Sequence, residues 1–501
     1  MQTPAPLTER FTSPSFKSSF ANALPGYLPT QRWFTSKGKK IDECHVERVL
    51  RVTDAAALLV VRVDFADGST EMYQMPVAQL TTTHDQMQYT KAHPGLVMLQ
   101  VPGGPFLVDA VPTAAFRAAI YEMIRSEAVT NQGLRCDAGK LLRTAPATAP
   151  SVVPAIDTSN TAIVYNDQFF FKLFRKLDKG LNPDLELVRY LSERADFQHC
   201  PPYGGSIGIG QMHDADYLNL GMMSGKVDND GDAWEYFQGL TERYYTHGGT
   251  VDRETLDRAE LLGKRTAEMH LKLARGADAG AMLTPEAMSP DYRTEITAAA
   301  RKLLNRQMGE LADKLPGLTP EQRSLAKKVL GLKDQLDDKL QRLATKPMDL
   351  DLIRIHGDYH LGQVLVTAHD FYIIDFEGEP LLSIPERRRK RPALKDVAGM
   401  VRSFHYAARG QLLLNPKYSD DQKAAHAARG ERWFKEVSEA YLAAYFAECG
   451  LASFLPKNEE DRSLLLDLFI LEKAIYEVAY ELNSRPEWLS IPLSGVLGVA
   501  E

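Results

Sequence analysis

The stretch Arg354–Pro380 reads RIHGDYHLGQVLVTAHDFYIIDFEGEP, and it decides the fold. Its two apolar runs, Val364–Thr367 and Phe371–Asp375, flank the polar segment Ala368–Asp370. Short apolar runs on either side of a turn predict an antiparallel β-hairpin. Because a hairpin this short is held rigid by its turn, the residues at its open end are expected to keep fixed positions.

Polar side chains gather at the open end of this hairpin. A hairpin centred on His369 places Gln363 opposite Asp375, with Cβ atoms about 5 Å apart. Asp358 comes five residues before Gln363, in the loop that enters the hairpin. Amide and carboxylate oxygens suit a hard cation such as Mg²⁺, and a second carboxylate can take a proton from a substrate hydroxyl. The spacing therefore predicts phosphoryl transfer.

Two other interpretations of the same segment stay open. His356, Asp358 and His360 alternate, and on a strand they would share one face as zinc ligands. Gly357 interrupts any such strand, which weakens the zinc interpretation. The second alternative is a purely structural polar turn. For His356, we expect a structural role in which it braces the loop by hydrogen bonds to nearby backbone.

A kinase also needs a cation for the nucleotide phosphates, and Lys172 is the candidate. It lies in the predicted strand Gln168–Arg175 (QFFFKLFR), where an unpaired ammonium among apolar side chains is costly. Glu186, in the predicted helix Pro183–Ala195, is the expected partner, as in protein kinases. Asp184, two residues earlier, is the alternative, and a Lys that reaches out to solvent from an edge strand is another.

The predicted phosphate loop has an unusual composition. The segment TSNT contains no glycine, but Ser159, Asn160 and Thr161 could offer hydroxyl, amide and backbone donors to phosphates. An ordinary turn is the alternative. The glycine-rich run GGSIGIG at Gly204–Gly210 lacks the spacing of a dinucleotide or phosphate loop, so a tight strand turn is predicted there.

Composition limits the class of protein. The chain has 501 residues, which indicates roughly two or three domains. Its 59 Lys and Arg against 66 Asp and Glu give a net charge of −7, which argues against a nucleic-acid partner. The four cysteines form no CxxC pair, and neither a secretory signal nor a membrane span is visible. A cytoplasmic protein with no membrane partner is expected.

The two ends of the chain differ in predicted secondary structure. Ala57–Phe65 and Glu71–Val77 are strand-like runs separated by an Asp-Gly hairpin signal. The Pro-Gly-Gly-Pro segment at Pro102–Pro105 suggests a domain boundary. From about Asp228 onward the pattern is mostly helical, as in Thr255–Leu273. The chain is therefore predicted to be β-rich first and α-rich later.

One helix near the C-terminus combines aromatic and charged residues. In Glu472–Trp488 (EKAIYEVAYELNSRPEW), Lys473, Tyr476, Glu477 and Tyr480 fall at helical spacing on one face. Such a face suits a sugar, which accepts stacking and hydrogen bonds. The alternative is a helix packed on a neighbour with its polar groups paired.

The motifs HGDYHLGQ and IIDFEGEP resemble those of the aminoglycoside phosphotransferase and choline kinase group. LPTQRWFTSKG, GDAWEY and DVAGMVRSFHYAA narrow the resemblance to the maltokinases. It implies an α+β, bilobal, eukaryotic-protein-kinase-like fold with an extra β-rich N-terminal cap and a mostly helical C-lobe. The implied domains are a cap over 1–105, a kinase N-lobe over 106–226 and a C-lobe over 227–501.

The resemblance also implies an activity: ATP-dependent conversion of maltose to maltose 1-phosphate, on a route from trehalose to α-glucan and glycogen. Asp358 corresponds to the catalytic base, and Gln363 and Asp375 to the Mg²⁺ ligands. Lys172 corresponds to the lysine that contacts phosphate, and Glu186 to its partner. Sugar contacts are placed on His360, Lys473, Tyr476 and Arg485.

The sequence leaves open which molecule accepts the phosphoryl group and whether the protein has a protein partner. Related enzymes with a similar cap phosphorylate glucosamine, and another sugar or an amine could be the acceptor. A pseudokinase that binds trehalose synthase is a further alternative. The cap itself could stiffen the N-lobe or form a docking face for such a partner.

Overall fold

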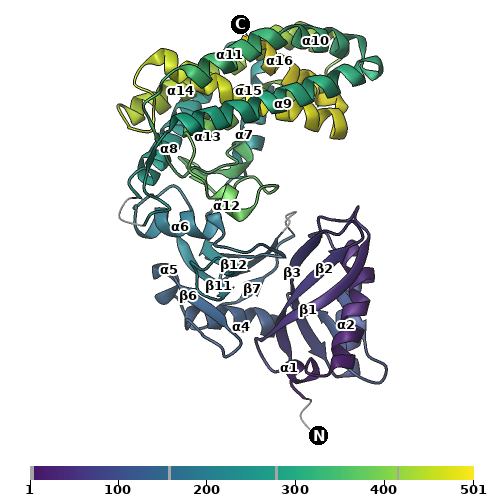
Figure 1. The fold of residues 1–501 in the computed structure, drawn as a ribbon. Helices are drawn as coiled ribbons and strands as arrows, with labels where there is room; N and C mark the ends of the chain where they lie inside the picture. Colours follow the sequence, from purple (N-terminus) through teal and green to yellow (C-terminus); the bar gives the residue numbers. More distant parts are fainter. Residues whose placement is uncertain (1–4, 156–159, 277–279, 415–416, 501) are drawn as a thin grey trace. The chain divides into compact units, whose positions relative to one another are not determined.

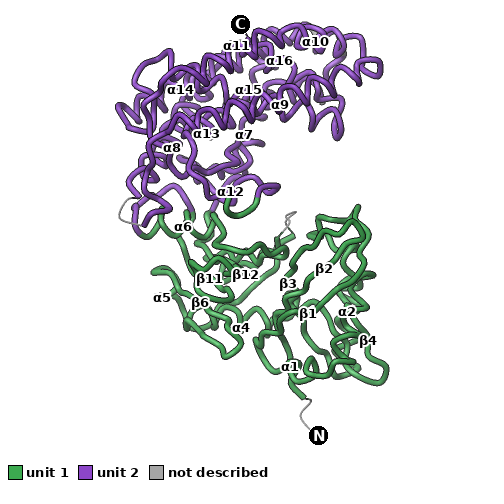
Figure 2. Tube along the Cα trace, in the orientation of Figure 1, with its two compact units in different colours: residues 1–193, 201–227, 383–385 green, residues 194–200, 228–382, 386–501 purple. Residues whose placement is uncertain are grey.

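The computed structural model describes residues 5–155, 160–276, 280–414 and 417–500. The chain divides into two compact units, which Figure 2 colours separately. The N-terminal unit contains residues 1–193, 201–227 and 383–385. The C-terminal unit contains residues 194–200, 228–382 and 386–501.

The first sheet of the N-terminal unit belongs to the cap (Figure 1). Its strands pair antiparallel in the order β1-β2-β3-β5-β4, and β10 joins the sheet on β3. The elements are α1 (Leu7–Arg10), α2 (Pro14–Tyr27), β1 (Ile41–Arg51), β2 (Ala56–Phe65), β3 (Thr70–Leu80), α3 (Thr83–Ala92), β4 (Val97–Gln100), β5 (Phe106–Asp109) and β10 (Lys176–Leu177).

The predicted strands of the cap are confirmed, but helix α2 was not predicted. Strand β2 is buried along nearly its whole length because its residues are almost continuously apolar. In α2, Phe20 and Leu24 are fully buried in the cap core. A signal for this helix is present, since Ser13 accepts a hydrogen bond from the Phe16 amide as an N-cap and Pro14 takes the first helical position.

The second sheet carries the predicted lysine strand. It pairs antiparallel in the order β6-β11-β12-β9-β8-β7. Its elements and the flanking helices are α4 (Ala114–Arg125), β6 (Leu134–Ala138), α5 (Lys140–Arg143), β7 (Ser151–Val152), β8 (Thr161–Tyr165), β9 (Phe169–Leu173), α6 (Pro183–Glu193), β11 (Tyr203–Ile209) and β12 (Leu218–Gly225).

The prediction of a tight turn at the glycine-rich run GGSIGIG is wrong. Those residues form β11, a fully buried strand between β6 and β12. A Cβ atom on Gly208 would lie 2.2 Å from the Tyr217 hydroxyl. The glycines therefore make room for side chains packed across the strand, which is a packing role that the sequence pattern alone does not reveal.

The C-terminal unit is mostly helical, as predicted. It contains α7 (Ala233–Thr246), α8 (Arg253–Leu273), β13 (Glu286–Ala287), α9 (Pro290–Lys314), α10 (Pro320–Gly331), α11 (Lys333–Thr345), β14 (Asp351–Leu352), β15 (Val364–Val366), β16 (Phe371–Ile373), α13 (Leu394–Leu414), α14 (Asp420–Cys449), α15 (Glu459–Ser484) and α16 (Ser490–Ala500); α12 (Ile384–Arg387) lies where the two units meet in the sequence.

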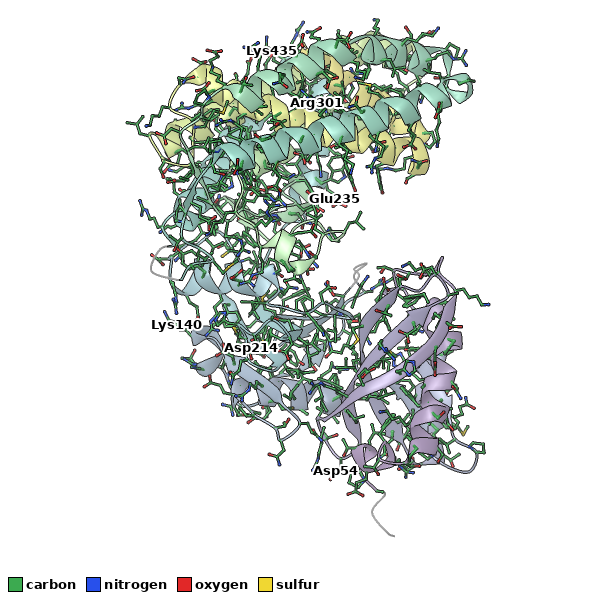
Figure 3. All side chains as sticks on the ribbon, viewed as in Figure 1. Asp54, Lys140, Asp214, Glu235, Arg301 and Lys435 are labelled. Atoms are coloured by element: carbon green, nitrogen blue, oxygen red, sulfur yellow. The ribbon has the colours of Figure 1, made fainter. Side chains whose placement is uncertain are left out.

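Side-chain contacts tie these helices together. For example, Arg301 of α9, labelled in Figure 3, donates to Gln341 of α11 over 3.0 Å. The four cysteines are buried and free. Among the residues that the structure describes, every helix is too short or too polar to cross a lipid bilayer.

Candidate active site

A buried carboxylate fixes the backbone of the loop that carries Asp358. Asp396, near the start of α13, is 2% exposed and accepts two backbone hydrogen bonds from this loop. Its Oδ2 atom accepts from the His356 amide at 2.7 Å, and Oδ1 accepts from the Gly357 amide at 2.9 Å. These two bonds fix the backbone immediately before Asp358, whose side chain is 24% exposed.

Asp396 is itself oriented by His270 of α8. The His270 Nε2 and Asp396 Oδ2 atoms lie 3.1 Å apart, and the His270 Nδ1 atom lies 2.9 Å from the Tyr445 hydroxyl of α14. Burial alone would raise the pKa of Asp396, but the hydrogen bond from His270, the charges of the nearby histidines and the Gly357 amide outweigh it and lower that pKa. Asp396 is therefore held as a carboxylate.

His356 has the structural role that the sequence predicted. It is 1% exposed, and its Nε2 atom lies 2.9 Å from the Ile374 carbonyl oxygen. Its Nδ1 atom accepts a 3.4 Å contact from the Asp358 amide. With both ring nitrogens engaged, His356 has no lone pair left for zinc, and His356, Asp358 and His360 form no metal-binding group among the described residues.

Two glycines shape this loop. Gly357 has φ +89°, a left-handed conformation that a side chain would strain. Gly399 lies one turn of α13 after Asp396, and a Cβ atom there would lie 2.5 Å from the Tyr359 carbonyl oxygen. The absence of a side chain at Gly399 lets α13 approach closely enough for Asp396 to reach the loop.

The hairpin is present, but its register differs from the prediction by one residue. Val364 pairs with Ile373, and the Ile374 amide donates to the Gln363 carbonyl at 3.0 Å. The Thr367 amide donates to the Asp370 carbonyl, so the turn has four residues and the hairpin is not centred on His369. The predicted pairing of Gln363 with Asp375 is therefore wrong.

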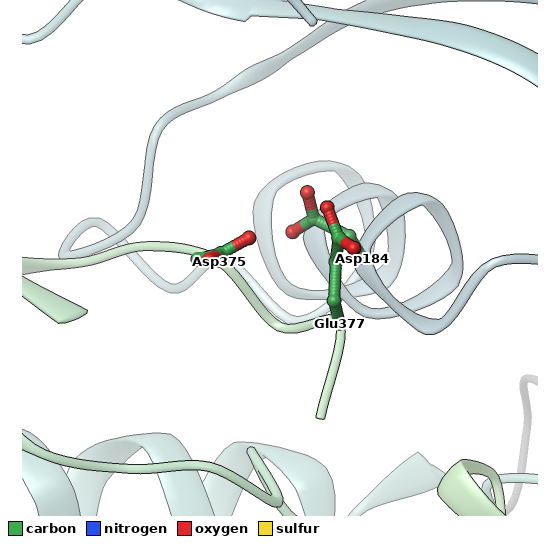
Figure 4. Close-up of side chains that lie close together, drawn as sticks. All are labelled: Asp184, Asp375 and Glu377. Atoms are coloured by element: carbon green, nitrogen blue, oxygen red, sulfur yellow. The ribbon is translucent and has the colours of Figure 1, made fainter. Parts of the chain in front are cut away.

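Asp375 follows the paired part of the hairpin and has φ +64°. Its carboxylate and that of Glu377, both half-buried, each bring an oxygen atom within 4.8 Å of the other. Figure 4 shows both side chains on the segment that leaves β16. Two carboxylates are hard oxygen donors, which fit Mg²⁺, and a contribution from the Gln363 amide stays a prediction. Glu377 was not predicted, although a second acid two residues after Asp375 is a visible signal.

Helix α15 supplies a mixed aromatic and basic face beside Asp358. The Lys473 Nζ atom lies 3.5 Å from Asp358 Oδ1 and 5.8 Å from the centre of the Tyr476 ring. Tyr476 and Tyr480 are 42% and 49% exposed. The Arg485 guanidinium lies 5.1 Å from the centre of the Tyr480 ring. The structure thus brings the predicted Lys473 next to Asp358, with tyrosine rings open to a ligand.

Two acidic residues of α15, Glu477 and Glu481, are bonded to arginines. Glu477 accepts from Arg402 at 2.6 and 2.9 Å, and burial raises its pKa. Glu481 accepts from Arg485 at 2.8 and 3.0 Å and from the Tyr406 hydroxyl. Glu481 thus neutralises Arg485, and Lys473 is the basic group of this helix that lies beside Asp358.

His360 lies in the same loop as Asp358. Its Nδ1 atom accepts from the Gly362 amide at 3.1 Å, which caps the turn leading to the hairpin. Burial lowers its pKa, against the charge of Asp358. His360 is therefore held neutral, and its part in binding sugar stays a prediction.

In the N-terminal unit, Lys172 lies on β9 as predicted and forms an ion pair. Its Nζ atom is 2.9 Å from Asp184 Oδ2, in α6. Asp184 is 1% exposed, and its amide donates to the N-cap side chain of Asn182 at 2.9 Å. Asp184, the alternative partner that the sequence left open, forms this ion pair, because the second residue of α6 points its carboxylate at β9. A role for Glu186 stays a prediction.

The predicted phosphate loop is described in part. Ser159 lies outside the described residues, while Asn160 precedes β8 and Thr161 begins it. The Thr161 hydroxyl accepts from Arg175 Nε at 2.8 Å. That hydroxyl can still donate its own proton, so a phosphate contact by Thr161 stays compatible with the structure.

Sequence reasoning did not single out Asp396 and His270, which support the loop of Asp358 in the candidate site. Asp396 lies in DVAGMVRSFHYAA, which was quoted only for its resemblance, and His270 lies in the predicted helix Thr255–Leu273. Their importance comes from contacts between residues 39 and 126 positions apart. A signal that could have pointed to Asp396 is an acidic residue in the first turn of a helix that continues with the apolar run Val397–Val401.

Two protein families match this chain. Residues 27–112 match the maltokinase N-terminal cap domain, and residues 216–416 match the phosphotransferase enzyme family. Residues 216–416, which include Asp358, Gln363 and Asp375, are thus similar to phosphotransferase enzymes. The N-terminal region is similar to the cap domain of maltokinases.

Two curated relatives that resemble part of this chain are glucosamine kinases. A glucosamine kinase from Streptacidiphilus jiangxiensis is 26% identical over 52% of this chain and 53% of its own length. One from Mycolicibacterium smegmatis is 29% identical over 27% of this chain and 32% of its own length. The matches thus span about half or less of these relatives.

The fold extends over nearly the whole chain. A glucosamine kinase structure superimposes with a TM-score of 0.67 at 18% identity, covering 97% of this chain and 99% of that one. A second, in complex with glucosamine, ADP and inorganic phosphate, gives 0.64 at 17% identity over 95% and 98%. The predicted α+β kinase-like fold with an N-terminal cap is confirmed.

Proposed function

We propose that this protein is an ATP-dependent sugar kinase that converts maltose and ATP to maltose 1-phosphate and ADP. The observation that carries the proposal is the Asp358 carboxylate, fixed by Asp396 and placed 3.5 Å from Lys473 beside exposed tyrosines. A proton acceptor next to a stacking surface is what a sugar hydroxyl requires. The maltokinase-type cap supports maltose as the acceptor.

In this proposal, Asp358 orients and deprotonates the acceptor. The anomeric hydroxyl donates a hydrogen bond to Asp358, which takes its proton as the oxygen attacks the γ-phosphorus of ATP. Lys473 steadies the carboxylate before transfer and limits its motion. The tyrosine rings of α15 offer faces for the sugar rings. Catalysis rests on positioning and charge neutralisation rather than on a covalent intermediate.

The phosphate side uses Lys172 and a group of hard oxygen donors. Lys172, positioned by Asp184, contacts the ATP phosphates. Gln363, Asp375 and Glu377 are the residues that would hold Mg²⁺, which when bound neutralises charge on the phosphates. The place of the product on a route from trehalose to glycogen, and a complex with trehalose synthase, rest on the resemblance alone.

Ion pairing on the acceptor side gives little support to glucosamine. Glucosamine carries a cationic amine near neutral pH. On the α15 face, Glu477 is bonded to Arg402 and Glu481 to Arg485, so both carboxylates already have cationic partners. A neutral disaccharide needs no carboxylate partner, so we place glucosamine second.

The test is ATP consumption with Mg²⁺ over a panel of maltose, glucose, glucosamine and choline. We expect maltose to give the highest kcat/KM and Asp358→Asn to lower kcat by about a thousandfold, because the general base is lost. Asp338→Asn, on the exposed side of α11, serves as the control and should leave turnover unchanged. Normal turnover by Asp358→Asn would disprove the assignment, and preference for glucosamine would replace maltose.

A further inference from the structure

The cap reaches the strand that carries Lys172 through one buried glutamine. Gln74 of β3 is fully buried, and its backbone N–H donates to the Arg175 carbonyl at 2.7 Å. Its Nε2 atom donates to the carbonyls of Phe174, at 2.7 Å, and Leu220, at 2.8 Å. Phe174 follows β9 directly and Leu220 lies in β12, so one cap side chain joins both strands beside Lys172.

A second connection runs through Arg175 to the start of β8. Arg175 is 3% exposed, and its Nη2 atom donates to Asp109 Oδ2 at 2.7 Å. Its Nε atom donates to the Thr161 hydroxyl at 2.8 Å. The guanidinium thus links the end of cap strand β5 with Thr161, the last residue of the predicted phosphate loop.

The ring of Trp33 covers this guanidinium. The Arg175 Cζ atom lies 4.8 Å from the centre of the Trp33 ring, which is 7% exposed. The Arg175 Nη1 atom is buried and has no hydrogen-bond acceptor within the described part of the chain. A desolvated guanidinium with an unused edge gains more from an aromatic face than an exposed one does. Trp33 is therefore well placed to hold the orientation of Arg175.

We propose that Trp33 and Arg175 are positioning residues for the nucleotide-phosphate site, so that the cap sets the affinity for ATP. This inference rests on the proposed function, because it takes Lys172 and Thr161 as phosphate contacts. Arg175 lies three residues after Lys172 and bonds Thr161. Without the Trp33 ring, the Arg175 guanidinium is held less firmly. The distance between β8 and the end of β9, which this guanidinium bridges, is then less fixed.

The test compares three substitutions in the full-length protein. Trp33→Leu removes the aromatic face, Trp33→Phe keeps one, and Phe34→Leu removes a neighbouring buried ring that packs on Phe65 and Tyr73. We expect Trp33→Leu to raise the KM for ATP by about fivefold, with the KM for maltose and kcat little changed. Trp33→Phe should stay within about twofold of the wild type, and Phe34→Leu should lower Tm without changing the KM for ATP.

A second measurement does not depend on activity. Amide hydrogen exchange in peptides over 161–165 and 169–175 should speed up in Trp33→Leu and not in Phe34→Leu. Equal effects of the two leucine variants, or no change in exchange and in KM for ATP, would overturn the proposal. If the wild type neither binds ADP in calorimetry nor consumes ATP, the proposed function fails, whereas faster exchange confined to Trp33→Leu would still establish the link from cap to strand.

Discussion

Asp375 illustrates how much depends on a single backbone conformation. In a regular strand, a shift of one residue turns every side chain to the opposite face. Here the register differs by one from the prediction, but Asp375 lies beyond the pairing and has φ +64°. That left-handed step redirects the chain, so the direction of the Asp375 carboxylate is set by its own backbone rather than by the ladder. Strained residues of this kind gather at functional sites.

Asp396→Asn tests the support of the catalytic loop. The amide NH₂ of Asn would face an N–H donor of His356, Gly357 or His270, so at least one buried hydrogen bond is lost. We expect a loss of about 2 kcal/mol in the free energy of unfolding and a fall in kcat of about tenfold or more, with the KM for ATP unchanged.

Urea unfolding and steady-state kinetics measure these effects. Asp338→Asn on α11 removes an equal charge at an exposed position and should change neither quantity. If both variants behaved alike, Asp396 would not be the support of the loop.

At the scale of elements, three helices hold the hairpin and its loop. Helix α13 contributes Asp396, while α8 contributes His270 and also Arg265. Arg265 donates to both carboxylate oxygens of Asp370 at 2.7 Å, which clamps the hairpin turn. Helix α15 contributes Lys473. The loop of Asp358 and the hairpin after it are therefore bonded to three separate helices.

Gly399→Ala tests the approach of α13 to the loop. A Cβ atom 2.5 Å from the Tyr359 carbonyl oxygen forces the helix or the loop to move. We expect a loss of about 1–3 kcal/mol in the free energy of unfolding, together with reduced kcat. Gly309→Ala is the matched control, because a Cβ there meets nothing within 4 Å on α9.

In an open helical position, Gly309→Ala should stabilise by about 0.5–1 kcal/mol. Thermal unfolding of both variants, with kcat, provides the comparison. Stabilisation by Gly399→Ala would contradict the close approach.

At the scale of the whole molecule, each unit has its own means of stabilisation. The N-terminal unit relies on the apolar core of the cap and on the buried contacts of Gln74 and Arg175. The C-terminal unit also buries a network of charges. Arg402 is 1% exposed and bonds Glu477 and His405, while Glu431 bonds Arg409. Such networks tie global stability to pH.

The stability of the C-terminal unit is expected to fall in mild acid because of His405. Burial, with the charges of Arg402 and Arg409, lowers its pKa to about 4, although Glu431 opposes the shift. Between pH 6.5 and about 4 the unfolded chain binds the proton and the folded chain does not. Stability is therefore fully present above pH 6.5 and is lost as the pH falls, by about 3–4 kcal/mol at most.

Urea unfolding at a series of pH values tests this expectation. His405→Gln should flatten the slope between pH 6.5 and 4, whereas His247→Gln at an exposed position should leave it as in the wild type. An unchanged slope in His405→Gln would show that other groups carry the effect.

The sequence alone determined the local parts of this protein. The hairpin, the strand with Lys172, the helix of Asp184 and the aromatic face of α15 were all predictable, because periodicity and turn residues act over a few positions. The kinase-like class also followed from short motifs.

Only the tertiary structure decided which of these parts meet. The one-residue change of register follows from how the turn at Thr367 closes. The partner of Lys172, the support of the loop by Asp396 and His270, and the cover of Trp33 on Arg175 join residues from 12 to 142 positions apart. Such contacts depend on how the elements pack against one another. The energy differences between Asp184 and Glu186 as the partner of Lys172, or between two hairpin registers, are too small to be visible in sequence patterns.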